Sequence, residues 1–444
     1  MRIRTGAPAD GVIGFWMSVA LVMGNMIGSG IFLLPASLAP YGSLSLGGWL
    51  VSTAGSVMLA LVFARLARLD PAAGGPYAFT RRAFGDLPGF LVGWGYWIST
   101  WVSLGALAVA FVGYLSPFFP ALVRSPPAAA LVAVAVVWLL IGVNVAGVRR
   151  ASWVQLVTTV LKTLPLVAVG FAGLVTFDST HFVVAHGNLR DSAAAVTATA
   201  TLTLWAFLGL ESATVPSGSI HEPERTIPRA TVVGTLLTAA IYIASTVGVM
   251  SLLPATTLGQ STAPFADAAR AVAGGAAATA VALGAGVSCF GALNGWVLLI
   301  GQLTLAMGRD GLFPSVFARV SNRGVPAAGM IIAGILTTGL VSLNYTRGLV
   351  DLFTFFILLS TLNTLIPYLF SSLAVFLLRD PAESQVSKTT AAVALLAFAY
   401  SLWAIAGAGK DIVYWGFLLI LVGLPVFVVV QRTSPGSVSS RDSV

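Results

Sequence analysis

The sequence predicts an all-α membrane protein with twelve transmembrane helices. Of its 444 residues, 57% are hydrophobic and only 9% are charged, and the mean hydropathy is +0.94. A soluble domain carries about 25% charged residues, so a chain this apolar would aggregate in water. Two further observations support this fold class: the apolar residues fall into segments of spanning length, and the basic residues gather on one side of them.

The predicted spans follow from the thickness of a bilayer, because a helix needs about 20 mostly apolar residues to cross it. Twelve segments meet this requirement, and their even number puts both termini on the same side. They lie near 13–38, 44–66, 88–116, 129–148, 152–176, 195–217, 228–252, 276–306, 326–344, 350–378, 390–407 and 412–431.

The basic residues orient these spans. Seventeen of the 23 Lys and Arg residues lie on the side of the N-terminus, five lie on the other side, and Lys162 lies inside a span. The positive-inside rule therefore predicts a multi-pass protein of the inner (cytoplasmic) membrane with both termini in the cytoplasm. The same asymmetry explains the net charge of +8 without a nucleic-acid partner.

No low-complexity linker divides the chain, so we expect a single domain. This domain would cover residues 12–432, between a short polar tail at 1–11 and a Ser-rich tail at 433–444.

The composition also argues against several kinds of chemistry. Three His and the single Cys289 cannot form a disulfide and offer little for a zinc site, so we expect no metal and no cofactor. No acidic or His cluster and no nucleophile motif supports an enzyme. No ring of like charges supports a channel.

Two ionisable residues lie well inside predicted spans, Lys162 and Glu211. Such a group costs about 2.5–3.5 kcal/mol at the bilayer centre, so it needs a partner or a task. Desolvation favours the protonated form of Glu211, which makes it a candidate for proton exchange; the alternative is a hydrogen-bonded structural carboxyl. Lys162 is either functional or a structural tether. The sequence leaves open whether the two residues meet.

Two spans contain helix-weakening sequences. The first has glycines in the segment 24–30 with Pro35 beyond, and the sixth has Gly209 just before Glu211. Unwound amides at 28–30 would open a second half-helix, whose positive end suits a carboxylate. Glycines in membrane helices also serve close packing alone. Interrupted first and sixth helices, five spans apart, favour an inverted-repeat transporter with its site near the midplane.

Aromatic residues in the spans offer ring faces to a cationic or apolar substrate. Each of them could equally pack in the core or anchor the helix at the interface. The candidates are Tyr96, Trp101, Trp205, Trp296 and Tyr368.

These segments carry a family resemblance. The segment 25–35 resembles the opening helix of the amino acid–polyamine–organocation superfamily. The segment 203–213 resembles the sixth-helix motif of the bacterial basic amino acid/polyamine antiporters, as do shorter segments at 222–225, 261–265 and 310–314. The likeness extends from about residue 12 to 430, and its nearest branch is that of the arginine/agmatine antiporters.

The resemblance implies a five-plus-five inverted repeat, over about 12–176 and 195–378, with two further C-terminal helices. It implies exchange of an amino acid for a related amino acid or its decarboxylated amine by alternating access, and it allows a homodimer. The implied substrate-binding residues are Ile27, Ser29, Gly30, Ser99, Thr100, Trp205, Leu208, Trp296 and Ser360. The implied gate residues are Tyr96, Glu211 and Tyr368, with Glu211 the proton-sensitive group. Lys162 is expected to take part in coupling beside them.

Two positions depart from the arginine/agmatine pattern. Leu104 replaces an asparagine, which removes a polar group that could bind a guanidinium, although Asn294 offers a compensating amide. Lys162 replaces a small apolar residue and resembles the lysine of sodium-independent, proton-coupled members, in which an ammonium takes the place of a sodium ion. The substrate could therefore be a neutral or smaller amino acid. The alternative function is a proton-coupled amino acid symporter.

Overall fold

The computed structural model describes residues 12–71, 74–115, 118–181, 189–261, 263–344, 349–378, 385–407 and 410–433. Within these ranges the chain is almost entirely helical, and the one β-type pairing is a single parallel bridge between Ile13 and Ile220. The predicted tail at 1–11 and nearly all of that at 433–444 lie outside the described residues.

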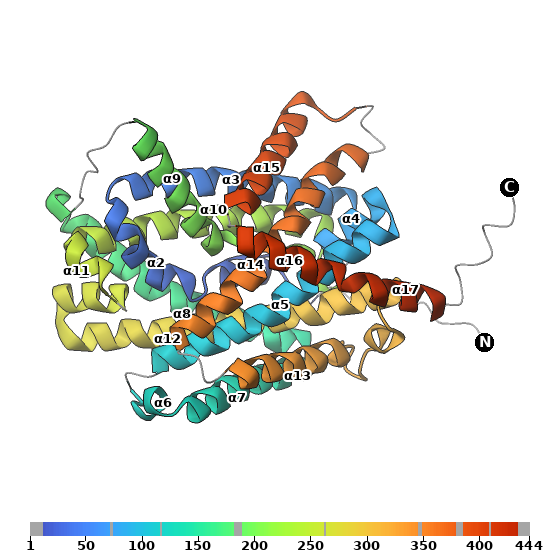
Figure 1. Ribbon diagram of the computed structural model, residues 1–444, viewed down its shortest axis with the longest axis horizontal. Coiled ribbons are helices and arrows are strands. Elements are labelled where there is room, and N and C mark those ends of the chain that lie inside the picture. Colours follow the sequence, from blue (N-terminus) through green and yellow to red (C-terminus); the bar gives the residue numbers. More distant parts are fainter. Residues whose placement is uncertain are drawn as a thin grey trace, which may run out of the picture.

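Most of the helices that make up the spans run roughly side by side along the longest axis of the molecule (Figure 1). They are α1 Phe15–Met26, α2 Gly30–Leu38, α3 Leu44–Leu69, α5 Asp86–Leu115, α7 Pro126–Val145, α8 Val148–Val175, α9 Leu189–Leu204, α10 Pro223–Leu252, α12 Pro264–Arg309, α13 Ala327–Asn344, α14 Leu349–Leu377, α15 Lys388–Gly407, α16 Lys410–Leu421 and α17 Gly423–Thr433. Three short helices connect them: α4 Pro76–Phe84, α6 Ala121–Arg124 and α11 Ala255–Gly259.

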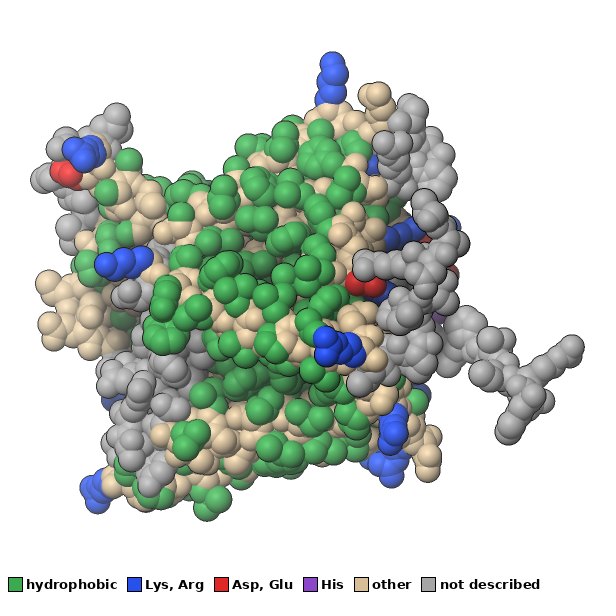
Figure 2. Space-filling model, turned by 45° about the vertical axis from the view of Figure 1, so that its right-hand side comes forward, with side chains coloured by type: hydrophobic (Ala, Val, Ile, Leu, Met, Phe, Trp, Pro, Cys, Tyr) green, Lys and Arg blue, Asp and Glu red, His purple; other side chains and the backbone are tan. Residues whose placement is uncertain are grey.

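The helices account for the predicted spans. Among the described residues, ten helical segments are long and apolar enough to cross a membrane, and the bent pair α1–α2 makes an eleventh. The shorter apolar helix α13 occupies the place of the ninth predicted span. Figure 2 shows hydrophobic side chains covering the middle of one face, with most of the Lys and Arg side chains toward its margins. The chain is an all-α, multi-pass membrane protein, as predicted.

The first span is broken where its glycines predict. α1 ends at Met26 and α2 begins at Gly30, and the two axes are bent by 45°. The three residues between them, 27–29, leave carbonyls at the end of α1 and amides at the start of α2 without helical partners.

The sixth span is broken over a longer stretch than expected. α9 ends at Leu204, five residues before Gly209, and a 3₁₀ turn follows at Trp205–Phe207. Gly209 has φ +102°, which a side chain would disfavour, and further short turns follow to Ser219. A hydrogen bond from another helix stabilises this early end of α9: the hydroxyl of Tyr242 on α10 donates to the carbonyl of Ala206 (3.0 Å).

The helix contacts repeat with a period of five spans. The third span (α5) packs on the tenth (α14), and the eighth (α12) packs on the fifth (α8). Likewise the second span (α3) packs on the sixth (α9), and the seventh (α10) packs on the first (α1). The third and tenth spans of the first pair correspond, five spans on or back, to the eighth and fifth of the second pair. The second and sixth spans correspond in the same way to the seventh and first. This is the relationship expected of a five-plus-five repeat.

Candidate functional site

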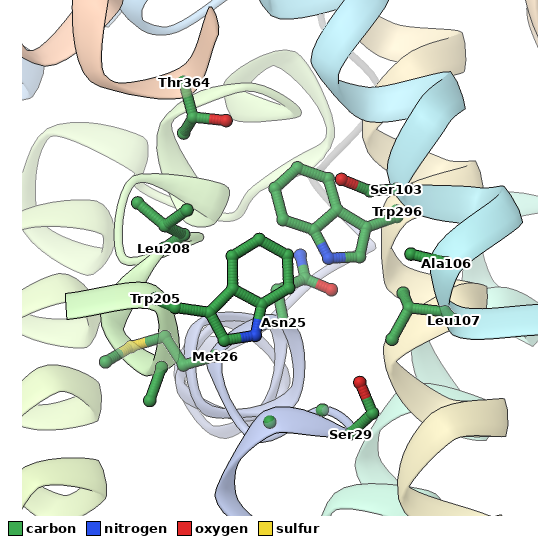
Figure 3. A pocket seen from close by; sticks show the side chains of 13 residues that line it. Asn25, Met26, Ser29, Ser103, Ala106, Leu107, Trp205, Leu208, Trp296 and Thr364 are labelled. Carbon is green, nitrogen blue, oxygen red and sulfur yellow. The ribbon is translucent and has the colours of Figure 1, made fainter. Parts of the chain in front are cut away.

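A small cavity lies where the two broken helices meet α5 and α12 (Figure 3). Its volume is about 30 Å³, which is room for about two water molecules. The lining residues come from both breaks and from α5, α12 and α14. They are Asn25, Met26, Gly28, Ser29, Gly30, Ser103, Ala106, Leu107, Trp205, Ala206, Leu208, Trp296 and Thr364.

The start of α2 presents polar groups to this cavity. Ser29, the residue before α2, is buried, and its hydroxyl has no hydrogen-bond partner among the described residues. Gly30 follows, and a Cβ placed there would lie 2.6 Å from the indole Nε1 of Trp205. The lack of a side chain at Gly30 therefore lets this indole lie directly against the helix start, where free amides and the helix dipole favour an anion.

Side chains of α8 and α12 donate hydrogen bonds to the carbonyls at the end of α1. The Lys162 Nζ, fully buried on α8, donates to the carbonyls of Gly24 (2.6 Å) and Ile27 (2.5 Å). The hydroxyl of Ser288 on α12 donates to the carbonyls of Ile27 (3.2 Å) and Gly28 (3.0 Å). The Lys162 amine thus faces the negative end of α1, where the helix dipole favours a positive charge.

Glu211 lies in the unwound part of the sixth span, where it accepts hydrogen bonds from the hydroxyls of Tyr96 on α5 and Tyr368 on α14. All three side chains are fully buried. The hydroxyl of Tyr368 also accepts a bond from the Gly209 amide (3.1 Å), and the ring of Tyr96 packs edge-on against Trp296 at 6.5 Å. Glu211 therefore joins three elements next to the cavity, whereas Lys162 binds a separate set of partners.

The indoles of Trp205 and Trp296 both lie in the centre of the cavity view, with Asn25 beside them (Figure 3). Leu208 lies on the side of Trp205, and Ser29 lies at the opposite end from Thr364. Ser29, Gly30, Trp205, Leu208 and Trp296 are thus the predicted binding residues that line the cavity.

The other predicted binding residues lie close to the cavity without lining it. The hydroxyls of Ser99 and Thr364 are 2.8 Å apart, Thr100 donates to the carbonyl of Trp97, and Ser360 is buried on α14. Ile27 takes part through its carbonyl, as described above, and its side chain is buried.

The face that α5 turns toward the cavity differs from the one expected. Leu104 is fully buried and lines no part of the cavity, which Ser103, Ala106 and Leu107 line instead. Positions 103, 106 and 107 share one helix face, with the i, i+3, i+4 spacing. The leucine at position 104 therefore does not contact a ligand directly in this conformation.

Four residues that line the cavity were not among the binding residues expected from the sequence: Asn25, Met26, Ala206 and Thr364. The one signal in the sequence was the position of Asn25 and Met26 next to the break in the first span.

Asn294 does not face the cavity but belongs to a buried amide network. Its Nδ2 donates to the carbonyl of Ala151 (2.9 Å) and to Gln155 Oε1 (3.2 Å), and its Oδ1 accepts from Asn144 Nδ2 (3.0 Å). These bonds tie α12 to α7 and α8. Asn294 is therefore placed to hold helices together and does not compensate for the apolar side chain of Leu104.

A second, wider opening lies at the end of α12. This polar cleft has a volume of about 700 Å³, and Arg81, Arg309 and Asp310 are among its lining residues. Arg81 pairs with Asp310 (2.8 Å), whose carboxylate also accepts from the Tyr77 hydroxyl (2.9 Å). Burial, together with the charge of Asp310, raises the pKa of Tyr77 well above its usual range. The short helix α4 is thereby fastened to the end of α12.

Comparison of this chain with known proteins identifies its family. The family model for amino acid permeases matches residues 13–436. The chain is 37% identical over 372 residues to the cadaverine/lysine antiporter of Escherichia coli (strain K12), covering 81% of this chain and 82% of that protein. It is 34% identical to a putative arginine/ornithine antiporter of Bacillus subtilis (strain 168), covering 94% and 97%. It is 32% identical to the putrescine transporter PotE of Haemophilus influenzae, covering 94% and 96%.

Among solved structures, the fold is similar to that of MhsT in complex with L-phenylalanine. The TM-score is 0.58 over 91% of this chain and 97% of that one, and the sequence identity is 15%. At this identity the likeness shows the fold alone. Together with the family match and the relatives above, it leads to one conclusion: this chain belongs to the amino acid permease family, and it is a membrane transporter and not an enzyme.

Proposed function

We propose that the protein exchanges an amino acid for a related amino acid or for its decarboxylated amine across the cytoplasmic membrane, with both termini in the cytoplasm. The observation that carries the proposal is the meeting of two broken helices at a cavity between two indoles. The names of the relatives support antiport of amino acids and amines. Arginine/agmatine exchange is the form that the sequence resemblance predicts.

The substrate carboxylate would dock at the start of α2. Ser29 supplies a free hydroxyl there, and the backbone of Ile27 and Gly30 borders the same break. The rest of the substrate would lie against Trp205 and Trp296. None of the thirteen lining residues is charged, so a cationic tail would be held by ring faces and by the hydroxyls of Ser103 and Thr364.

Transport would require movement, because a cavity of about 30 Å³ is too small for an amino acid. The first, second, sixth and seventh spans would rock together against the remaining helices. Lys162 links the two parts, since it reaches from α8 to the break in the first span. We assign it the place that a sodium ion would take in a sodium-coupled transporter.

Glu211 would be the proton-sensitive gate. Its two tyrosine partners come from α5 and α14, so a change in its charge alters hydrogen bonds between three elements at once. Protonation would weaken the acceptor that both hydroxyls share and would loosen this side of the cavity.

The test is uptake into proteoliposomes at one acidic and one neutral pH, with and without unlabelled amino acid inside. The competitor panel contains arginine, agmatine, ornithine, lysine, cadaverine and several neutral amino acids. Exchange predicts uptake only into preloaded vesicles and competition by an amine. Uptake into empty vesicles that follows the proton gradient would overturn exchange and favour the symporter.

A further inference from the structure

Asn25 connects the two broken helices beside the cavity. It is the second-last residue of α1, it lines the cavity, and its side chain is buried. Its Nδ2 donates to the hydroxyl of Ser212 (2.8 Å), and that hydroxyl donates to the carbonyl of Gly209. Because the single proton of the Ser212 hydroxyl is used in this way, Ser212 can only accept from Asn25. This fixes the orientation of the amide: Nδ2 faces the sixth span, and Oδ1 faces the other side.

The Oδ1 of Asn25 faces α12 and has no hydrogen-bond partner among the described residues. A Cβ on Gly295 would lie 1.9 Å from this oxygen, so the lack of a side chain at Gly295 makes room for it. A buried acceptor without a partner costs about 1–3 kcal/mol. The amide is therefore bonded on the side of the sixth span and unbonded on the side of α12.

Gln155 on α8 presents the complementary group at the same place. Its Oε1 accepts from the Nδ2 of Asn294, which also donates to the carbonyl of Ala151, so the other atom of the Gln155 amide is Nε2. This Nε2 is buried, has no partner in the described part of the chain, and lies 3.0 Å from the position of the same Cβ on Gly295. A free donor of α8 and a free acceptor of α1 thus lie against one glycine of α12, with no bond between them in this conformation.

The face of α8 that carries Gln155 is otherwise bonded to the first span. Thr159 and Lys162 follow at the i+4 and i+7 positions, on the same helix face. The hydroxyl of Thr159 donates to the carbonyl of Ala20 (3.1 Å), and Lys162 donates to that of Gly24 (2.6 Å). The Nε2 of Gln155 would lie 1.9 Å from a Cβ on Gly24, so it lies directly against the backbone of α1. Gln155 is thus the third of three donors directed at the first span, and the other two are bonded to it.

We propose that Asn25 is a positioning residue for the transport movement, whose Oδ1 accepts a hydrogen bond from Gln155 Nε2 when the first span moves against α8. The inference rests on the rocking in the proposed function, which moves α1 and the sixth span together. Both atoms lie within 3.0 Å of one point, so a helix shift of about 1–2 Å brings them into bonding distance. Because Ser212 moves with Asn25, the new bond fastens both breaks to α8 and stabilises the second conformation.

The test is hydrogen–deuterium exchange mass spectrometry of the full chain in nanodiscs, with no substrate added. The reporter is the segment 213–221, which follows the break in the sixth span and borders the polar cleft through Ser219. Gln155→Met removes the donor and so disfavours the second conformation. Deuterium uptake by the reporter should fall by about two- to tenfold, the value of one hydrogen bond, because the chain leaves the described conformation less often.

Two substitutions of Asn25 separate this bond from a general loss of packing. In Asn25→Leu the acceptor is absent, so Gln155→Met should have no further effect on uptake. In Asn25→Asp an oxygen remains on the side of Gln155, so the effect should return. The matched control is Asn144→Leu, which removes another bond to Asn294 but no donor directed at α1, and its uptake should equal that of the wild type.

An equal fall from Gln155→Met in the wild type and in Asn25→Leu would overturn the proposal, because Gln155 would then act without Asn25. So would an equal fall in Asn144→Leu, which would assign the effect to the amide network. An unchanged or increased uptake in Gln155→Met would also overturn it, because the bond would then not stabilise a second conformation. No substrate enters the measurement, so its result does not depend on whether the protein exchanges amino acids.

Discussion

The Nζ of Lys162 lies 2.6 Å from the carbonyl oxygen of Gly24, so a side chain of the fifth span holds the first span where that span breaks. Ile27 offers the second carbonyl to the same ammonium. The two bonds join a part of the molecule expected to move to a part expected to stay in place. This pair of bonds is the first target for mutation.

We expect Lys162→Ala to lower the exchange rate by at least about tenfold, because α8 loses both of its hydrogen bonds to the break in the first span, and one such bond to a charged group contributes about 1.5–3 kcal/mol. The effect on exchange should exceed the effect on stability, since Ser288 still binds Ile27. Initial exchange rates in proteoliposomes and thermal unfolding in detergent measure the two effects. Lys388→Ala, at the exposed start of α15, is the matched control. An exchange rate of Lys162→Ala equal to that of the wild type would indicate that Lys162 has a structural role alone.

Replacement of the buried gate carboxyl should change the pH profile and not only the rate. We expect Glu211→Gln to flatten the pH dependence of uptake, because the amide keeps hydrogen bonds to Tyr96 and Tyr368 but takes up no proton. Uptake over a pH series is the measurement. Glu224→Gln, which alters an exposed carboxylate in the first turn of α10, should keep the wild-type profile. An unchanged profile in Glu211→Gln would remove its proton role.

A methyl group at the start of α2 should weaken substrate binding. In Gly30→Ala the new Cβ would lie 2.6–2.7 Å from the Trp205 indole, so the ring must shift from its present place in the cavity lining. We expect the KM for exchange to rise at least about tenfold, equivalent to about 1.4 kcal/mol. Gly14→Ala is the control, because nothing lies within 4 Å of its added methyl. A KM equal to that of the control would show that Trp205 is not part of the binding site.

The amide network should matter for stability more than for binding. Asn294→Leu removes one hydrogen bond each from Ala151, Gln155 and Asn144, all of which are buried. At about 1–3 kcal/mol for an unsatisfied group, we expect a clear drop in the thermal unfolding midpoint with little change in KM. Gln260→Leu, at an exposed position, should leave the midpoint unchanged. A large rise in KM would instead point to substrate binding by Asn294.

The sequence predicted the spans and both breaks because these depend on local properties. Segment length and glycine content determine whether a helix can cross a bilayer and where it weakens. The early end of α9 at Leu204 was not predictable, because it goes with a bond from Tyr242, 36 residues beyond Ala206.

The site residues divide in the same way. Gly30 and Trp205 could be identified from the breaks and the resemblance, and both line the cavity. The orientation of α5 could not be identified in this way. Ser103 and Leu104 are neighbours in the chain, but one step along a helix turns the side chain by about 100°. Likewise nothing local indicates that Lys162 meets Gly24, 138 residues away, or that buried amides gather around Asn294. Those bonds depend on the packing of whole helices.

The burial of Cys289 has a practical consequence for observing transport. It is the single cysteine of the sequence, and its side chain on α12 is fully buried. A thiol introduced at Ser219, on the rim of the polar cleft, would then be the one group open to a maleimide dye. Its labelling rate with and without substrate would report opening and closing on that side directly, with the native cysteine left in place.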